Sequence, residues 1–111
     1  MSAAIPPSLI PAQEKIDEMF RATVPELTCD DDQKKGRMYK LGSRRLCGVR
    51  VRLGHLSLHL YGLPIAEPDP TGLLVARTRS HLRAEVRNYE EARRMQPLLD
   101  RVYAVACLSR S

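Results

Sequence analysis

Residues 45–61 read Arg-Leu-Cys-Gly-Val-Arg-Val-Arg-Leu-Gly-His-Leu-Ser-Leu-His-Leu-Tyr, and this stretch decides the fold. Apolar and polar residues alternate on both sides of the Gly-His pair, a pattern typical of two half-buried strands. Glycine at the first turn position allows a two-residue type II′ hairpin. That turn predicts Leu53 opposite Leu56 and Val51 opposite Leu58 on an apolar face. The opposite face then carries arginine, histidine, serine and tyrosine.

The chain of 111 residues is expected to form a single domain, 1–111, with residues 1–8 as a loose, proline-rich tail. Its hydrophobic fraction of 43% is ordinary for a soluble globular protein, but only 5% of the residues are aromatic. The core must therefore be mostly aliphatic. No apolar run approaches membrane-spanning length, and the first residues lack the basic region of a signal peptide.

The cysteines number three, at positions 29, 47 and 107, and no Cys-x-x-Cys pair occurs. An odd count without that spacing argues against a disulfide scaffold and against a structural zinc site. We therefore expect reduced thiols in a cytoplasmic protein. No cofactor is expected.

Helical spacing of apolar residues predicts an N-terminal helix that Pro25 ends. A second amphipathic pattern begins at Asn88, which stands in capping-box spacing with Glu91. Pro97 lies inside this pattern and predicts a kink or two separate helices. Residues 28–36 are polar and predict a loop.

Between the helices, strands are expected at residues 37–41, 45–53, 55–61 and 81–87, with a further short strand or turn at 73–76. A bulge at Cys47-Gly48 is one possibility that leaves the first hairpin register open. The fold class is therefore α+β. We expect a two-layer sandwich in the order α-β-β-β-β-α, with an antiparallel sheet of about four to five strands flanked by an N-terminal and a C-terminal helix.

Three segments resemble a known group. Residues 38–49 read Met-Tyr-Lys-Leu-Gly-Ser-Arg-Arg-Leu-Cys-Gly-Val, residues 55–62 read His-Leu-Ser-Leu-His-Leu-Tyr-Gly, and residues 81–92 read His-Leu-Arg-Ala-Glu-Val-Arg-Asn-Tyr-Glu-Glu-Ala. Over roughly residues 12–106 the chain is similar to the YdhG-like and YjbR-like superfamily of small uncharacterised bacterial domains.

The resemblance implies a frataxin-like α-β-α arrangement without an agreed catalytic site. One branch of the superfamily has been linked to iron delivery, and another carries a DNA-binding label. This chain departs from the iron-chaperone pattern because it lacks a long acidic ridge. The Gly-x-Pro-x-Tyr pattern of YdhG-like proteins is also missing before the hairpin, where Lys35-Gly36-Arg37-Met38-Tyr39 stands.

The polar sheet face is the first candidate site. Neighbouring strands lie about 4.8 Å apart, so side chains of the same face form one patch. Guanidinium groups bind phosphate or carboxylate in bidentate fashion, and the formal charge of +5 favours an acidic partner. A solvated strand face with Glu85 as a local ion-pair partner is the alternative reading. The residues predicted on this face are Arg50, Arg52, His59, Tyr61, Arg83 and Arg87.

Other chemistry has weaker signals. His55 and His59 lie roughly 13 Å apart along an extended strand, too far to share a metal ion. The run Asp30, Asp31 and Asp32 offers hard-cation ligands but lacks a calcium-loop pattern. No catalytic motif is recognisable.

The leading hypothesis is a non-catalytic cytoplasmic binding or accessory domain whose basic sheet face takes nucleic acid or another anionic partner, with no membrane partner. One alternative is a frataxin-like protein that handles a metal, iron, with the first helix and the aspartate run. The other is a small enzyme with a pocket under loop 62–72.

Overall fold

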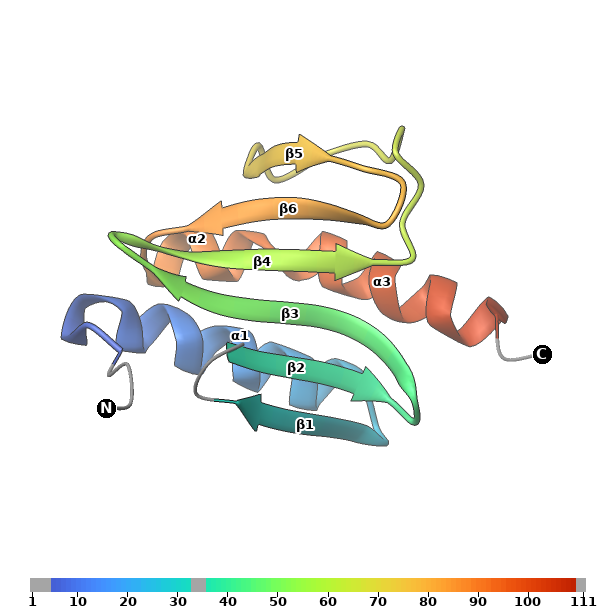
Figure 1. The fold of residues 1–111 in the computed structure, drawn as a ribbon, viewed down its shortest axis with the longest axis horizontal. Helices are drawn as coiled ribbons and strands as arrows, with labels where there is room; N and C mark the ends of the chain where they lie inside the picture. The colour runs from blue at the N-terminus through green and yellow to red at the C-terminus, as the bar shows by residue number, and fades with distance from the viewer. Residues whose placement is uncertain (1–4, 33–35, 110–111) are drawn as a thin grey trace.

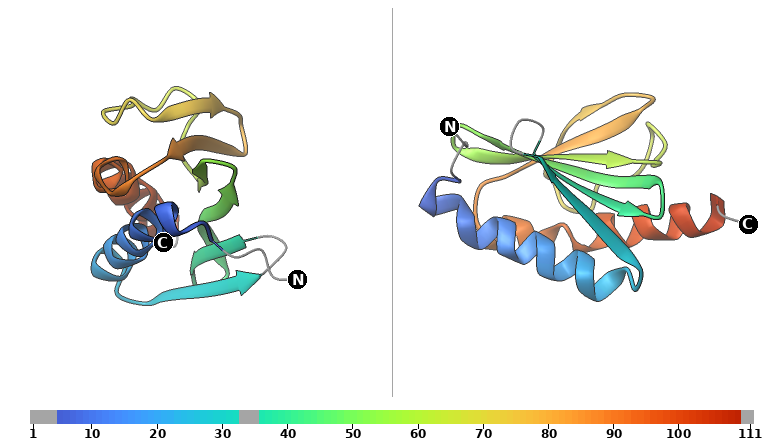
Figure 2. Two further views of the ribbon diagram at one scale, coloured as in Figure 1. Left: turned by 90° about the vertical axis from the view of Figure 1, so that its left-hand side faces the viewer. Right: turned by 60° about the horizontal axis from the view of Figure 1, so that its bottom comes forward.

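The computed structural model describes residues 5–32 and 36–109, with only the backbone of Asp32 and Ser109. Six strands form one antiparallel sheet in the order β1-β2-β3-β4-β6-β5. Figures 1 and 2 show the helices on one face of this sheet, while the other face carries no helix. In chain order the elements are η1 (Pro7–Leu9), α1 (Ile10–Thr23), β1 (Leu27–Asp32), β2 (Gly36–Leu41), β3 (Arg44–Arg52), β4 (His55–Tyr61), β5 (Leu74–Arg77), β6 (His81–Val86), α2 (Tyr89–Arg94) and α3 (Gln96–Ser109).

Helix ends follow the sequence signals. Pro11 lies in the first turn of α1, and the extended residue Val24 ends that helix one position before Pro25. The Asn88 side chain accepts a hydrogen bond from the Glu91 N–H at 2.9 Å, which confirms the predicted cap of α2. The pattern around Pro97 forms two helices, because α2 ends at Arg94 and α3 begins at Gln96.

The core lies between the sheet and the helices and is mostly aliphatic. The inward residues of the central strand β4 are fully buried, as are residues that α1 and α3 present to them. This confirms the apolar face predicted from the alternating pattern. Its most buried members include Ile16, Phe20, Leu56, Leu58, Leu60, Leu82, Leu98 and Leu99.

The β3–β4 hairpin turns one residue earlier than predicted. Val51 pairs with Leu56, and the turn consists of Leu53 and Gly54, so Leu53 is 99% exposed rather than opposite Leu56. Of the two central turn residues, only Gly54 has a positive φ, at 83°. This matches a turn with glycine at the second central position rather than type II′. The observed and predicted pairings differ by two residues, so the paired residues on either side of the turn keep their predicted faces. The predicted pairing was wrong, and Leu53, which was expected on the apolar face, lies exposed in the turn instead.

A bulge interrupts the β2–β3 ladder at Leu46. Tyr39 pairs with Cys47 and Lys40 pairs with Arg45, so Leu46 is the extra residue of β3. Leu46 and Cys47 are both fully buried although they are neighbours in one strand. Arg45 consequently lies on the opposite face from Cys47, which an uninterrupted strand would not allow.

The strand count was underestimated, and the predicted loop at residues 28–36 was wrong for its first part. Residues 27–32 form the edge strand β1. Its acidic residues find cross-strand cations, because Lys40 lies 2.7 Å from the Asp30 carboxylate and Arg37 lies 3.1 Å from that of Asp31. These ion pairs connect β1 to β2. They join residues of different strands, so the sequence of residues 28–36 alone does not predict them.

The segment 62–73 has no regular structure, as its prolines and glycines predicted. One carboxylate oxygen of Asp69 accepts hydrogen bonds from the N–H groups of Thr71 and Gly72, and the other accepts from that of Leu74. Glu67 is buried and accepts two hydrogen bonds of 3.1 Å from Arg101. The loop is thereby fixed against β5 and α3.

Candidate functional site: the open face of the sheet

One face of the sheet is not covered by the described helices (Figure 1). The burial patterns place on this face the side chains that alternate with the core residues of β2, β3, β4 and β6. All six predicted residues project from this face or from its rim. The cross-strand partner of His59 is Gly48 on one side and Arg83 on the other, so His59 lies at the centre. We call this surface the open face; its predicted members are Arg50, Arg52, His59, Tyr61, Arg83 and Arg87.

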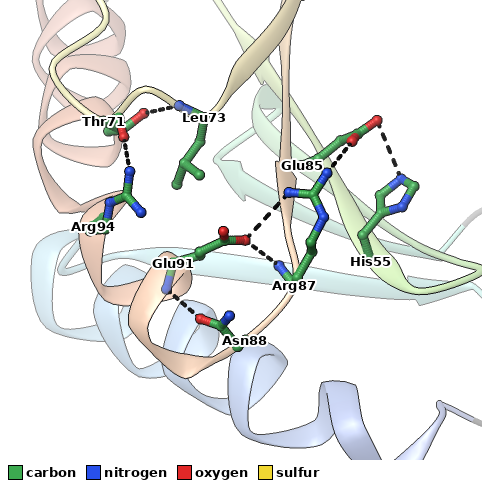
Figure 3. A network of polar contacts seen from close by, with 8 residues as sticks. All are labelled: His55, Thr71, Leu73, Glu85, Arg87, Asn88, Glu91 and Arg94. Carbon is green, nitrogen blue, oxygen red and sulfur yellow. Dashed lines mark hydrogen bonds and ion pairs between the residues drawn. The ribbon is translucent and has the colours of Figure 1, made fainter.

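Glu85 is an acidic residue of the open face, and its contacts with Arg87 and His55 are seen in Figure 3. Its carboxylate lies 3.3 Å from Arg83, 3.1 Å from Arg87 and 3.6 Å from His55. Arg87 also lies 3.6 Å from the Glu91 carboxylate, which links this cluster to α2. The positive charge of β6 is therefore largely offset, as the solvated-face reading expected.

The arginines of β3 have a different environment. Arg50 and Arg52 are exposed, and no carboxylate among the described side chains forms an ion pair with either of them. The nearest cross-strand partner of Arg50 is Ser57, a neutral residue. The uncompensated charge of the open face therefore lies on β3.

The pKa of His59 reflects this positive charge. Burial and then the positive groups of His81, Arg50, Arg83 and Arg52 lower the pKa of His59 from 6.5 to about 4. The imidazole is therefore neutral at pH 7, with one ring nitrogen that donates and one that accepts. It contributes a polar, uncharged group at the centre of the basic surface.

A hollow of about 460 Å³ opens beside His59. Gly48 forms part of its lining, and a Cβ atom at that position would lie 3.2 Å from the Met38 methyl group. The absence of a side chain at position 48 therefore helps to keep the hollow open. Its lining residues are Asp30, Gly36, Met38, Lys40, Arg45, Gly48, Arg50, His59 and Tyr61.

Ring systems gather along one wall of the hollow. The Arg45 guanidinium lies over the Tyr61 ring at 4.7 Å, and the His81 ring lies 5.9 Å from Tyr61 and 4.9 Å from His59. The low aromatic content did not predict this cluster. Arg45 was also missed, because only the bulge at Leu46 brings it to the open face. The one available signal was the ambiguous register of the first hairpin.

Ser57 lies on the polar side of β4, as predicted, but its burial was not predicted. It is 1% exposed, and its hydroxyl finds no hydrogen-bond partner within the described part of the chain. Its cross-strand partners are Arg50 and Glu85. A buried hydroxyl without a partner is unfavourable, so this point of the face has unused hydrogen-bonding capacity.

The described acidic groups of the metal-binding alternative are separated, and the side chain of Asp32 lies outside the described part of the structure. Asp30 faces the open side with Lys40, whereas Asp31 faces the helices with Arg37. In α1, Asp17 accepts hydrogen bonds from Arg21 at 2.7 Å and Tyr39 at 2.9 Å. Among the side chains that the structure describes, no three metal-ligating groups come together.

A second hollow of about 300 Å³ lies along α1, where Asp17, Glu18 and Arg37 take part in its lining with Ile5, Ile10, Gln13 and Glu14. It does not lie under loop 62–72, where the enzyme alternative placed a pocket. In that loop Leu63, Glu67 and Thr71 are buried against the rest of the protein.

Within residues 5–32 and 36–109, none of the helices has the length and apolar character needed to cross a bilayer.

The fold defines an α+β protein whose antiparallel sheet is covered by helices on one face. Comparisons with models of protein families, with curated proteins and with solved structures found no match. The likeness to the YdhG-like and YjbR-like superfamily stays a prediction.

Proposed function

We propose that the protein is a non-catalytic binding domain that holds single-stranded nucleic acid on the open face of its sheet. The observation that carries the proposal is the pair Arg50 and Arg52, exposed without a carboxylate partner in the described part of the chain. A polyanion supplies the missing negative charge and releases counterions as it binds.

The ring cluster favours nucleic acid over an acidic protein. His59 and Tyr61 line the same hollow as Arg50, and the His81 ring packs against both of their rings. Surfaces that bind single strands combine cationic groups for the backbone with rings on which bases stack. Because stacking accepts every base, the expected sequence preference is small. The three cysteines are free, which agrees with the proposed cytoplasmic location.

The test is fluorescence anisotropy with a labelled oligodeoxythymidine strand at increasing salt. The natural protein should bind at low salt, and the logarithm of the binding constant should fall linearly with the logarithm of the salt concentration. The double variant Arg50→Glu, Arg52→Glu should lose this binding. The matched control Arg79→Glu, Arg93→Glu changes the net charge equally in a turn and on α2, and it should retain binding.

Two outcomes would overturn the proposal. The first is undetectable binding at low salt, and the second is equal loss in the test and control variants, which would indicate only a general charge effect. A poly-glutamate arm completes the experiment. If poly-glutamate competes as well as the oligonucleotide at equal charge, the rings contribute nothing and the occupant is an acidic protein instead.

A further inference from the structure

The hollow beside His59 has features that a flat polyanion surface does not need. Its volume of about 460 Å³ falls within the roughly 300–1,000 Å³ of small-molecule sites. Two local irregularities build it: Gly48 provides no side chain on this face, and the bulge at Leu46 turns Arg45 toward the hollow. Bulges commonly redirect a side chain in this way next to functional sites.

The lining combines two kinds of recognition. Arg50 and Arg45 provide guanidinium groups, and among the described side chains neither has a carboxylate within ion-pair distance. The Tyr61 and His59 rings and the Met38 side chain provide a flat, weakly polar wall. Guanidinium groups match phosphate oxygens, and rings match a planar heterocycle.

The remaining polar pair supplies a hydrogen-bonding contact. Asp30 and Lys40 lie 2.7 Å apart at the β1–β2 side of the hollow and are partly exposed. An exposed ion pair of this kind contributes little and opens readily. The Asp30 carboxylate then accepts from hydroxyl or amino groups, while Lys40 adds a third cation.

From these observations we infer that the hollow is a discrete site for one nucleotide unit, with the phosphate on Arg45 and Arg50 and the base against Tyr61 and His59. This inference rests on the proposed function for the anionic character of the ligand. The unit has two possible sources, a free nucleoside monophosphate or one residue of a strand.

The probes are adenosine 5′-monophosphate, its two halves adenosine and inorganic phosphate, and the oligodeoxythymidine strand. NMR titration should show that the monophosphate binds at least tenfold more tightly than either half, with shifts at the Met38 methyl group and the His59 ring. A bound phosphate near His59 should also raise the pKa of its imidazole. If the strand shifts the Met38 and His59 signals and the monophosphate does not bind, the nucleotide unit in the hollow is a residue of a strand.

Gly48→Val fills the hollow without changing the charge. Position 48 lies in extended strand backbone without a positive φ, and the group it meets is the flexible end of Met38. We expect at least tenfold weaker binding of the monophosphate, and a loss of only a few-fold for the strand, which also contacts Arg52. Ala76→Val is the matched control on β5, opposite Arg83 and outside the hollow. Gly48→Ala replaces the valine variant if circular dichroism shows that the latter is unfolded.

The results separate the two proposals. A strand that binds without shifts at Met38 and His59, or monophosphate binding that Gly48→Val leaves unchanged, overturns the nucleotide site alone. Monophosphate binding with no strand binding overturns the proposed function and leaves the nucleotide site standing. If inorganic phosphate binds as tightly as the monophosphate, the base contributes nothing to binding, and the inferred nucleotide site is overturned.

Discussion

The two faces of the sheet are made from the same strands but have opposite surroundings. On β4, Leu56, Leu58 and Leu60 are fully buried beneath the helices, whereas His59 and Tyr61 between and beside them are partly exposed. On the covered face, aliphatic side chains predominate, and most of them are fully buried. On the open face, properties depend on single features such as the bulge at Leu46 and the position of Glu85. The comparison shows that alternation determines which face a residue occupies but not what that face does.

The largest expected difference between the faces is in stability. Leu58→Ala removes a fully buried side chain from a central strand and should lower the free energy of unfolding by about 2–5 kcal/mol. Arg50→Ala, on the open face of the neighbouring strand, should change it by less than about 0.5 kcal/mol. Urea denaturation measures both. Similar losses in the two variants would mean that the open face is covered by something that contributes to folding.

A smaller effect concerns the polar contact within the covered face. The Tyr39 hydroxyl donates to the Asp17 carboxylate at 2.9 Å, and Tyr39 stacks on Phe20 with ring centroids 4.6 Å apart. Tyr39→Phe keeps the stacking and should cost about 0.5–1.5 kcal/mol, typical of one hydrogen bond. Tyr61→Phe makes the same change on the open face and should be neutral in the same denaturation experiment. A larger loss of stability for Tyr61→Phe than for Tyr39→Phe would contradict the placement of Tyr39 on the covered face and Tyr61 on the open face.

A third test compares charge rather than packing. The His59 imidazole should titrate near pH 4 by NMR, below its ordinary 6.5. Because the folded state binds this proton less tightly than the unfolded state, His59 should reduce stability as the pH falls from about 6.5 toward 4. Arg50→Gln should raise the pKa, and Arg79→Gln in the β5–β6 turn should not. An ordinary pKa in the natural protein would refute the crowding of positive charge around His59.

The smallest expected effect is at the hairpin. Leu53→Ser should change the free energy of unfolding by less than about 0.5 kcal/mol, because this leucine is 99% exposed in the turn. The same leucine opposite Leu56 on the apolar face would cost several times more. Thermal unfolding of this single variant therefore distinguishes the two hairpin registers.

The sequence predicted the covered face well because its signal is local and repeated. Leu56, Leu58 and Leu60 alternate with polar residues, and no tertiary contact is needed to interpret them. β1 was missed because Asp30 and Asp31 are poor strand formers, and the cations that pair with them come from β2. Strand formation there depends on non-local pairs.

The hollow was unpredictable for a related reason. Arg45 reaches the open face only through the bulge, and position 48 matters only because Met38 and His59 flank it. His81 contacts His59 because β4 and β6 are neighbours in the sheet, although residues 62–80 with β5 separate these strands in sequence. Such relations require the register of three strands at once. The alternation of side chains along each strand was sufficient to assign Arg50, Arg52 and Arg83 to the open face. It contains no information about the hollow, which was therefore not predicted.

The two outermost strands have a consequence for behaviour at high concentration. β1 carries carboxylates on both of its sides, so a second copy that paired with it would bring like charges together. β5 is only four residues long and its ladder is irregular between Leu74 and Ala76. Short, bulged or charged borders are poor templates for another strand. The acidic run of β1 therefore acts as a gatekeeper against strand-by-strand polymerisation, and solutions of the protein should resist amyloid-type aggregation.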